Sequence, residues 1–190
     1  MSTTEPIRDL IKMKEFKNYY YDVKPNIRNY TLICLGINSA LRISDLLSLR
    51  WIDVYDFDRK DFLHHVTIVE QKTHKKTTIA LNRNALAALS AYLETRQTVL
   101  PDSYLFPGRD THLSRSQAFR IIKAAAENTH FEENISCHSL RKSFGYHAWK
   151  CGTPPAMLMA IYNHSSYQIT KRYLGIAQDD KDSVFLKINL

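Results

Sequence analysis

The hydrophobic pattern of this chain changes from helical spacing to alternation and then back to helical spacing. After Pro25, apolar side chains return every three or four residues, which places them on one face of a helix. The residues with this spacing are Ile27, Tyr30, Ile33, Cys34 and Ile37. The pattern predicts a helix from Ile27 to Ile37 and a short second helix from Ser44 to Leu49, with Arg42 between them.

Beyond Trp51, apolar and polar residues alternate, which is typical of strands. Three alternating segments, WIDVYDF, FLHHVTIVE and TTIAL, are separated by the turn sequences DRKD and KTHKK. Alternation places every second side chain on the same face of a strand. The pattern therefore predicts three short antiparallel strands in one small sheet.

Helix signals return after the strands. Asn82 can cap a helix that runs to about Gln97, and Ser114 can cap a helix that runs to Glu127. Asn and Ser suit this position because their side chains accept hydrogen bonds from the free N–H groups of a first turn. The intervening segment PDSYLFPGRD reads as a loop.

Three further helices are predicted in the last third of the chain. The first runs from His138 to Lys150 and is stopped by Gly152. The pair Pro154 and Pro155 opens the second, and Ser165 is a candidate cap for the last.

The two ends of the chain have weaker patterns. Residues 1–25 are polar and mixed and read as an arm or a first helix, and the tyrosines at 19 to 21 are expected to pack against the domain. In the tail, residues 179–190, alternate apolar positions fit one side of a short strand that would need a partner. These positions are Val184, Leu186, Ile188 and Leu190.

The composition fits one packed domain of 190 residues, because 44% of them are apolar and 24% are charged. No apolar run reaches the roughly 18 residues that a membrane helix needs. The start MSTTEPIRDL lacks the blocks of a signal peptide, so the cytoplasm is the expected compartment. Lys and Arg outnumber Asp and Glu by 26 to 19, and the net charge of +7 favours a polyanion as partner.

Neither a metal site nor a disulfide framework is expected. Cys34, Cys137 and Cys151 are widely spaced and read as reduced thiols. The histidines also lack the carboxylate or cysteine spacing of a metal site, so no metal and no other cofactor are predicted.

Two segments carry residues suited to chemistry at a phosphate. A reaction there needs a nucleophile, positive charge on the non-bridging oxygens and a proton for the leaving oxygen. In HSLR, His138 and Arg141 are three residues apart and would share one helix face, where an arginine fork can hold two phosphate oxygens. In NHSSYQITKRY, Tyr173 lies nine positions after His164, and a turn and a short helix would bring the two together.

The ordered set of motifs resembles the tyrosine recombinase, or phage integrase, family. LGINSALRISDLLSLRW resembles its first arginine box, ISCHSLRKSF its HxxR box, and NHSSYQITKRYL its box with a histidine and the nucleophile. EQKTHKKTTIAL is similar to its β-hairpin with a catalytic lysine, which would be Lys72. The resemblance covers Asn26 to Leu174 and is closer to the short fimbrial invertases than to longer members. It implies a mainly helical α+β catalytic domain with a small three-stranded antiparallel sheet.

The resemblance also implies roles for single residues. Arg42 and Arg141 would grip the scissile phosphate, His138 and His164 would assist them, and Tyr173 would be the nucleophile. The implied reaction forms a 3′-phosphotyrosyl intermediate and needs no nucleotide cofactor, because the bond energy is kept.

Two residues would support this set. Lys72 would protonate the departing 5′ oxygen, and Asp45, three residues after Arg42, would hold that arginine in place. The chain departs from the family at three positions: Ala40 and Asn163 replace common glycines, and Cys137 replaces a common proline.

Several assignments have alternatives. A shift of register on the hairpin would exchange Lys72 with Lys75 or Lys76, and Tyr162 and Tyr167 are rival nucleophiles by residue type. The arginines could instead be helix-terminal surface residues, His138 could cap its helix, and His164 could lie in a turn.

The expected partners are double-stranded DNA and further copies of the chain. Recombination joins two duplexes, so a homo-tetramer on DNA is predicted, with no membrane and no small-molecule substrate. Candidate contacts to DNA phosphates, with a solvated face as the alternative, are Lys75, Lys76, Arg115, Arg120 and Lys123.

We interpret residues 26–178 as the catalytic domain of a site-specific DNA recombinase. Residues 1–25 would precede it as an arm or helix, and the tail, residues 179–190, would be exchanged between subunits. Two alternatives remain: a type IB topoisomerase-like enzyme that religates the same strand, and a non-catalytic DNA-binding regulator with the same fold.

Overall fold

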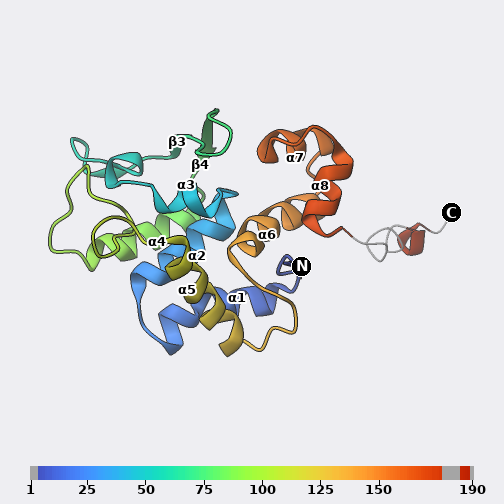
Figure 1. The fold of residues 1–190 in the computed structure, drawn as a ribbon, viewed down its shortest axis with the longest axis horizontal. Coiled ribbons are helices and arrows are strands. Elements are labelled where there is room, and N and C mark those ends of the chain that lie inside the picture. The colour runs from blue at the N-terminus through green and yellow to red at the C-terminus, as the bar shows by residue number, and fades with distance from the viewer. Residues whose placement is uncertain (1–3, 177–184, 189–190) are drawn as a thin grey trace.

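The computed structural model describes residues 4–176 and 185–188 and has the mainly helical α+β fold that the sequence predicts (Figure 1). The helices are α1 Leu10–Asn18, α2 Ile27–Ser39, α3 Ile43–Leu47, α4 Arg83–Glu94, α5 Arg115–Asn128, α6 Cys137–Lys150, α7 Pro155–Tyr162 and α8 Tyr167–Leu174. The strands are β1 Tyr55–Asp56, β2 Asp61–Phe62, β3 His65–Val69 and β4 Lys76–Ala80.

Capping side chains determine where the later helices begin. Asn82 caps α4 and Ser114 caps α5, so both predictions are confirmed. The prediction for α8 is wrong by one residue, because Ser166 rather than Ser165 accepts the N–H of Ile169. A serine can cap only where its hydroxyl reaches the free N–H groups of the first turn.

The predicted three-stranded sheet is wrong. The described residues form two separate antiparallel hairpins, β1 with β2 and β3 with β4. Trp51 and Val54 are both buried, at a spacing of three residues, because Trp51–Asp53 form a 3₁₀ turn before β1 starts. The long segment predicted as the middle strand is also divided, since its first part pairs with β1 and its second part with β4.

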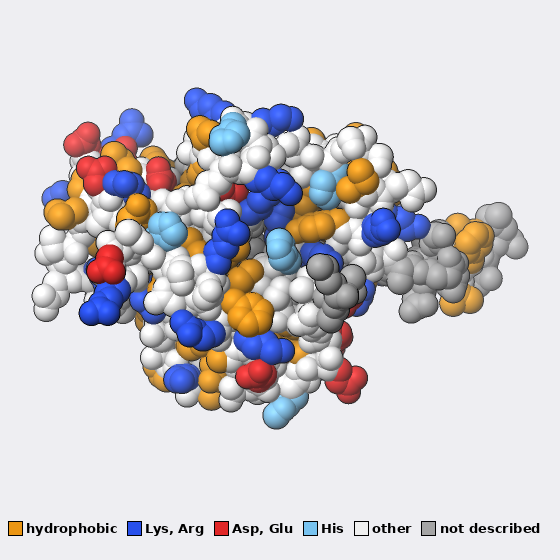
Figure 2. Space-filling view, viewed as in Figure 1, with side chains coloured by type: hydrophobic (Ala, Val, Ile, Leu, Met, Phe, Trp, Pro, Cys, Tyr) orange, Lys and Arg blue, Asp and Glu red, His pale blue; other side chains and the backbone are white. Residues whose placement is uncertain are grey.

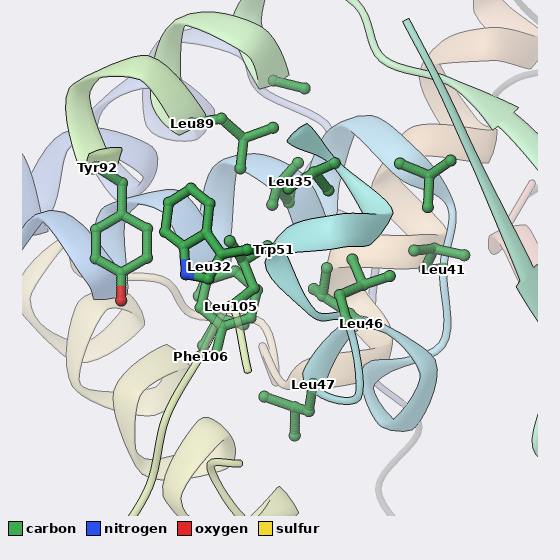
Figure 3. Close-up of a cluster of buried hydrophobic side chains, with 14 of the residues drawn as sticks. Leu32, Leu35, Leu41, Leu46, Leu47, Trp51, Leu89, Tyr92, Leu105 and Phe106 are labelled. Carbon is green, nitrogen blue, oxygen red and sulfur yellow. The ribbon is translucent and has the colours of Figure 1, made fainter. Parts of the chain in front are cut away.

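The main core lies between α2, α3 and α4 (Figure 3). Many of its side chains come from the apolar faces of these helices, and others come from the 3₁₀ turn that begins at Trp51, from β3 and from the loop before α5. Burial of large apolar side chains is the main driving force for this packing. The labelled members are Leu32, Leu35, Leu41, Leu46, Leu47, Trp51, Leu89, Tyr92, Leu105 and Phe106.

The segment before α2 packs on the same body. Phe16, Tyr19 and Tyr20 are buried in a second core cluster with Ile33 of α2 and Ile122 of α5. Two of the three neighbouring tyrosines therefore pack against the domain, as predicted.

The strand predicted for the tail falls mainly on positions outside the described residues. Of the tail, residues 185–188 are described, and 185–187 form a helical turn rather than a strand. Across the described ranges, no helix combines the length and apolar character needed to cross a bilayer.

Candidate active site

Four separate parts of the chain carry the predicted site residues. Arg42 precedes α3, Lys72 lies in the turn between β3 and β4, and α6 carries His138 and Arg141. His164 lies between α7 and α8, and Tyr173 lies on α8. In the view of Figure 1, the α7–α8 pair lies beside the β3–β4 hairpin. On the same face, Lys and Arg side chains gather near the middle, and most of the visible acidic side chains lie toward the edges (Figure 2).

Arg141 is buried at the centre of this region. Its Nη1 donates to the backbone carbonyl of Ala40, and its guanidinium carbon lies 4.7 Å from the ring centroid of Tyr162. The Tyr162 hydroxyl donates to the carbonyl of Arg141 at 2.7 Å. Through these two contacts Tyr162 supports the arginine. Because Tyr162 has no exposed surface, its hydroxyl cannot reach a DNA phosphate, which excludes it as the nucleophile.

Tyr173 of α8 reaches the same guanidinium. Its phenol lies close enough to Arg141 for the guanidinium charge to favour the ionised form of the hydroxyl, and its ring centroid lies 5.3 Å from that of His164. Burial raises the pKa of Tyr173, whereas the charges of Arg141 and Arg42 lower it, and burial has the larger effect. The phenol therefore keeps its proton at neutral pH, while two arginines already favour its ionised form.

Arg42 has a buried carboxylate as its partner. Its Nη1 lies 2.7 Å from Oε2 of Glu70, whose side chain is only 5% exposed. The same oxygen accepts the hydroxyl of Thr73 at 2.5 Å. Burial favours a higher pKa for Glu70, but the bond from Thr73 and the charge of Arg42 outweigh burial and lower the pKa. Glu70 is therefore ionised and tied to the arginine.

Asp45 was expected to hold Arg42, and this expectation is wrong in the described structure. The carboxylate of Asp45 is buried, and its Oδ1 accepts the backbone N–H of Gln71 at 2.9 Å. Asp45 thus fastens the β3–β4 hairpin to α3, while Glu70, the preceding hairpin residue, pairs with the arginine.

Both predicted histidines are shifted toward the neutral form. Burial, followed by the charges of Arg141 and Arg42, lowers the pKa of His164. Burial, followed by nearby cations that include Lys72, lowers the pKa of His138. The Nδ1 of His164 lies 3.1 Å from the Thr170 hydroxyl, which orients the ring.

The hairpin lysines occupy different places. Lys72 is exposed in the turn, and its charge reaches His138. Lys75 donates from Nζ to Oδ1 of Asn163 at 2.8 Å, which joins the hairpin to the residue before His164. Lys76 is exposed at the start of β4.

The predicted basic residues of α5 lie partly beside the site. Arg115 and Arg120 are exposed and line a groove of about 600 Å³ that His138 also lines. Lys123 is half-buried and does not line this groove. Arg115 and Arg120 are therefore placed for a ligand that also reaches His138.

Comparison with known proteins identifies the family. The family model described as the phage integrase family matches residues 9–179. The chain belongs to the phage integrase family. A probable integrase/recombinase, YoeC of Bacillus subtilis, is 41% identical over 181 residues, which cover 94% of this chain and 93% of the relative.

Longer members of the phage integrase family match more weakly. The tyrosine recombinase XerC of Neisseria gonorrhoeae is 29% identical over 154 residues, which cover 80% of this chain and 48% of XerC. Among solved structures, the XerA recombinase has a TM-score of 0.78 at 16% identity, covering all of this chain and 66% of its own. The catalytic domain of bacteriophage HP1 integrase has a TM-score of 0.62 at 16% identity, covering 96% of this chain and 95% of its own. The chain thus spans about half the length of XerC but nearly all of YoeC.

At the three departures of this integrase-family chain, the backbone has conformations that suit the family's common residues. Ala40 and Asn163 both have a φ of 54°, a left-handed conformation that glycine adopts without steric cost. Cys137 is the first residue of α6, where proline is favoured because its ring already has the helical φ. The common residues suit the backbone at these positions and carry none of the site's charged groups.

Glu70 was not predicted from the sequence as a residue of this integrase-family site. The available signal was a single acidic residue at the end of an alternating apolar segment, directly before the basic turn.

Within the described ranges, no group of three or more His, Cys, Asp or Glu side chains could hold a metal.

Proposed function

We propose that this chain breaks and rejoins DNA as a site-specific tyrosine recombinase. The observation that carries the proposal is the convergence of Tyr173 with Arg141 and Arg42, which come from three distant parts of the sequence. Two guanidinium groups beside a phenol suit one phosphodiester, because they stabilise the charge that develops on its non-bridging oxygens. The likeness to YoeC over nearly the full length of both chains supports the same activity.

In this proposal the Tyr173 hydroxyl gives up its proton to water as its oxygen attacks the phosphorus, and the bond to the 5′ oxygen breaks. Arg42 and Arg141 hold the phosphate, and the neutral rings of His138 and His164 hydrogen-bond to it. A 3′-phosphotyrosyl bond and a free 5′ hydroxyl result. A 5′ hydroxyl of a partner strand then reverses the step, so no nucleotide is consumed.

Lys72 is proposed as the acid that gives a proton to the leaving 5′ oxygen. Its exposed place in the hairpin turn, with its charge reaching His138, supports this role. Asp45 and Glu70 support it indirectly, because both attach the hairpin to the start of α3. Arg115 and Arg120 are proposed to contact neighbouring DNA phosphates.

The test is covalent capture on a pool of nicked duplexes with randomised sequence around the nick. A nick beside the scissile phosphate lets the short product diffuse away and traps the intermediate. We expect a denaturant-resistant adduct with the parent and with Tyr167→Phe, a control at the start of the same helix, and none with Tyr173→Phe. Binding without an adduct in the parent would support a regulator, and adducts that religate without strand exchange would support a topoisomerase-like enzyme.

We also propose that residues 26–178 form the catalytic unit and that four copies act together on DNA. Phe185, Leu186 and Ile188 of the tail are 77%, 81% and 58% exposed, which suits docking on a neighbouring subunit. A chain truncated after Gln178 should then assemble less well on captured DNA, as measured by native gel mobility. Normal assembly of the truncated chain would rule out the proposal that the tail is exchanged between subunits.

A further inference from the structure

Residues 4–8, named the strap below, pack against α6, the helix that carries His138 and Arg141. The buried Ile7 donates its N–H to Oγ of Ser143 at 2.8 Å, and its carbonyl lies 2.9 Å from Nε2 of His147. Ser143 and His147 are one turn apart on α6, so the strap is fixed to the helix that also carries Arg141.

One end of the strap reaches α8. Arg8 donates from Nη2 to the carbonyl of Gly175 at 2.9 Å, and the same nitrogen donates to Oε2 of Glu5 at 2.9 Å. Gly175 ends α8, two residues after Tyr173, with a φ of 66°. A Cβ at this glycine would lie 3.0 Å from the Arg8 nitrogen, so the arginine is packed closely against the end of the helix.

The other end of the strap reaches the ring of Tyr173 through Lys142. The Nζ of Lys142 donates to the carbonyl of Thr4 at 2.5 Å. The same nitrogen lies 5.4 Å from the centroid of the Tyr173 ring, within the range of a cation–π contact. Thr4 therefore helps to keep this ammonium group against the phenol ring.

We propose that the strap positions the nucleophile. Arg8 holds the carbonyl end of α8, and Thr4 holds Lys142 against the ring of Tyr173, so both contacts limit where the phenol oxygen can lie. The inference rests on the proposed function and deepens it. Because α8 has only eight residues, a displacement of its end is carried to Tyr173 with little loss. Arg8 is thus a positioning residue that acts through α8.

The test compares Arg8→Ala, Arg8→Lys and the control Arg59→Ala, which removes an exposed arginine paired with Asp56 in the β1–β2 turn. The first readout is single-turnover adduct formation on captured duplexes at saturating concentration. A displacement of about 1 Å can cost on the order of a hundredfold in rate, so we expect a loss of about ten- to a hundredfold for Arg8→Ala. Arg8→Lys keeps a cationic donor for Gly175 and should recover part of the rate, while DNA affinity stays unchanged in all three variants.

The second readout is amide hydrogen exchange, which does not depend on activity. In Arg8→Ala, exchange should become faster across residues 167–176 and remain unchanged across α4, which reports global stability. Parent-like adduct formation by Arg8→Ala, or slow formation without altered exchange at residues 167–176, would overturn the strap proposal. If the parent forms no adduct, the proposed function fails, and exchange alone decides the strap: faster exchange than in Arg59→Ala supports it, and equal exchange overturns it.

Discussion

Replacing Glu70 by glutamine tests whether the missed carboxylate positions Arg42 or competes with DNA for it. The substitution keeps the size of the side chain and an oxygen that can accept the Thr73 hydroxyl, but it removes the charge that faces Arg42 at 2.7 Å. Breaking an ion pair costs about 0.2 to 1 kcal/mol when the pair is exposed and about 3 to 5 kcal/mol when it is buried. Because the Glu70 side chain is 5% exposed and the Arg42 side chain 21% exposed, solvent screens the pair in part, and we expect a cost between these ranges, about 1.5 kcal/mol.

The loss should appear in both stability and rate. At about 2 to 4 °C per kcal/mol for a chain of this size, the Tm of Glu70→Gln should fall by about 3 to 6 °C. If Arg42 loses the same free energy of positioning, adduct formation should slow by about tenfold, since each 1.4 kcal/mol corresponds to that factor. Glu94→Gln is the matched control, because Glu94 is an exposed carboxylate on α4 with a long hydrogen bond from Ser90.

The pH dependence separates this effect from a general loss of packing. Since the pKa of Glu70 is lowered in the folded chain, its contribution is complete above the ordinary glutamate pKa of about 4.3 and is lost as the pH falls through the lower folded value. The difference in unfolding free energy between the parent and Glu70→Gln should therefore shrink in that acidic range. Faster adduct formation by Glu70→Gln than by the parent would refute the reasoning, because the carboxylate would then compete with phosphate for Arg42.

Two further predictions concern Gly145 of α6 and His164. Gly145→Ala places a methyl group 2.4 Å from the Tyr162 hydroxyl and 2.5 Å from Leu174 of α8, so thermal unfolding should show a loss of about 2 kcal/mol, although alanine favours a helix. Parent-like stability would contradict this packing. The lowered pKa of His164 means that the unfolded chain binds protons first, so stability should fall as the pH drops through about 6.5. The fall in Tm between about pH 7 and pH 5 should be smaller in His164→Gln, and an unchanged slope would contradict the assignment.

The amino-acid sequence alone was enough to predict the features of this protein that depend on short-range interactions. The helix starts at Asn82 and Ser114 were predictable because a cap depends on residues within one turn. The ordered motifs likewise indicated the family, because they are contiguous stretches that can be read without knowing how the chain folds. That Arg42, Arg141 and Tyr173 lie close together, by contrast, could be expected only from the family resemblance.

Tertiary structure decided the partners of the charged groups. Asp45 stands at helical spacing from Arg42, yet Glu70 holds the arginine because the β3–β4 hairpin brings its carboxylate to the start of α3. The strap contact of Arg8 with Gly175 joins residues 167 positions apart, and no local sequence pattern predicts it. Such pairs depend on how helices and hairpins pack, and packing sums many weak long-range contacts that no short window of sequence contains.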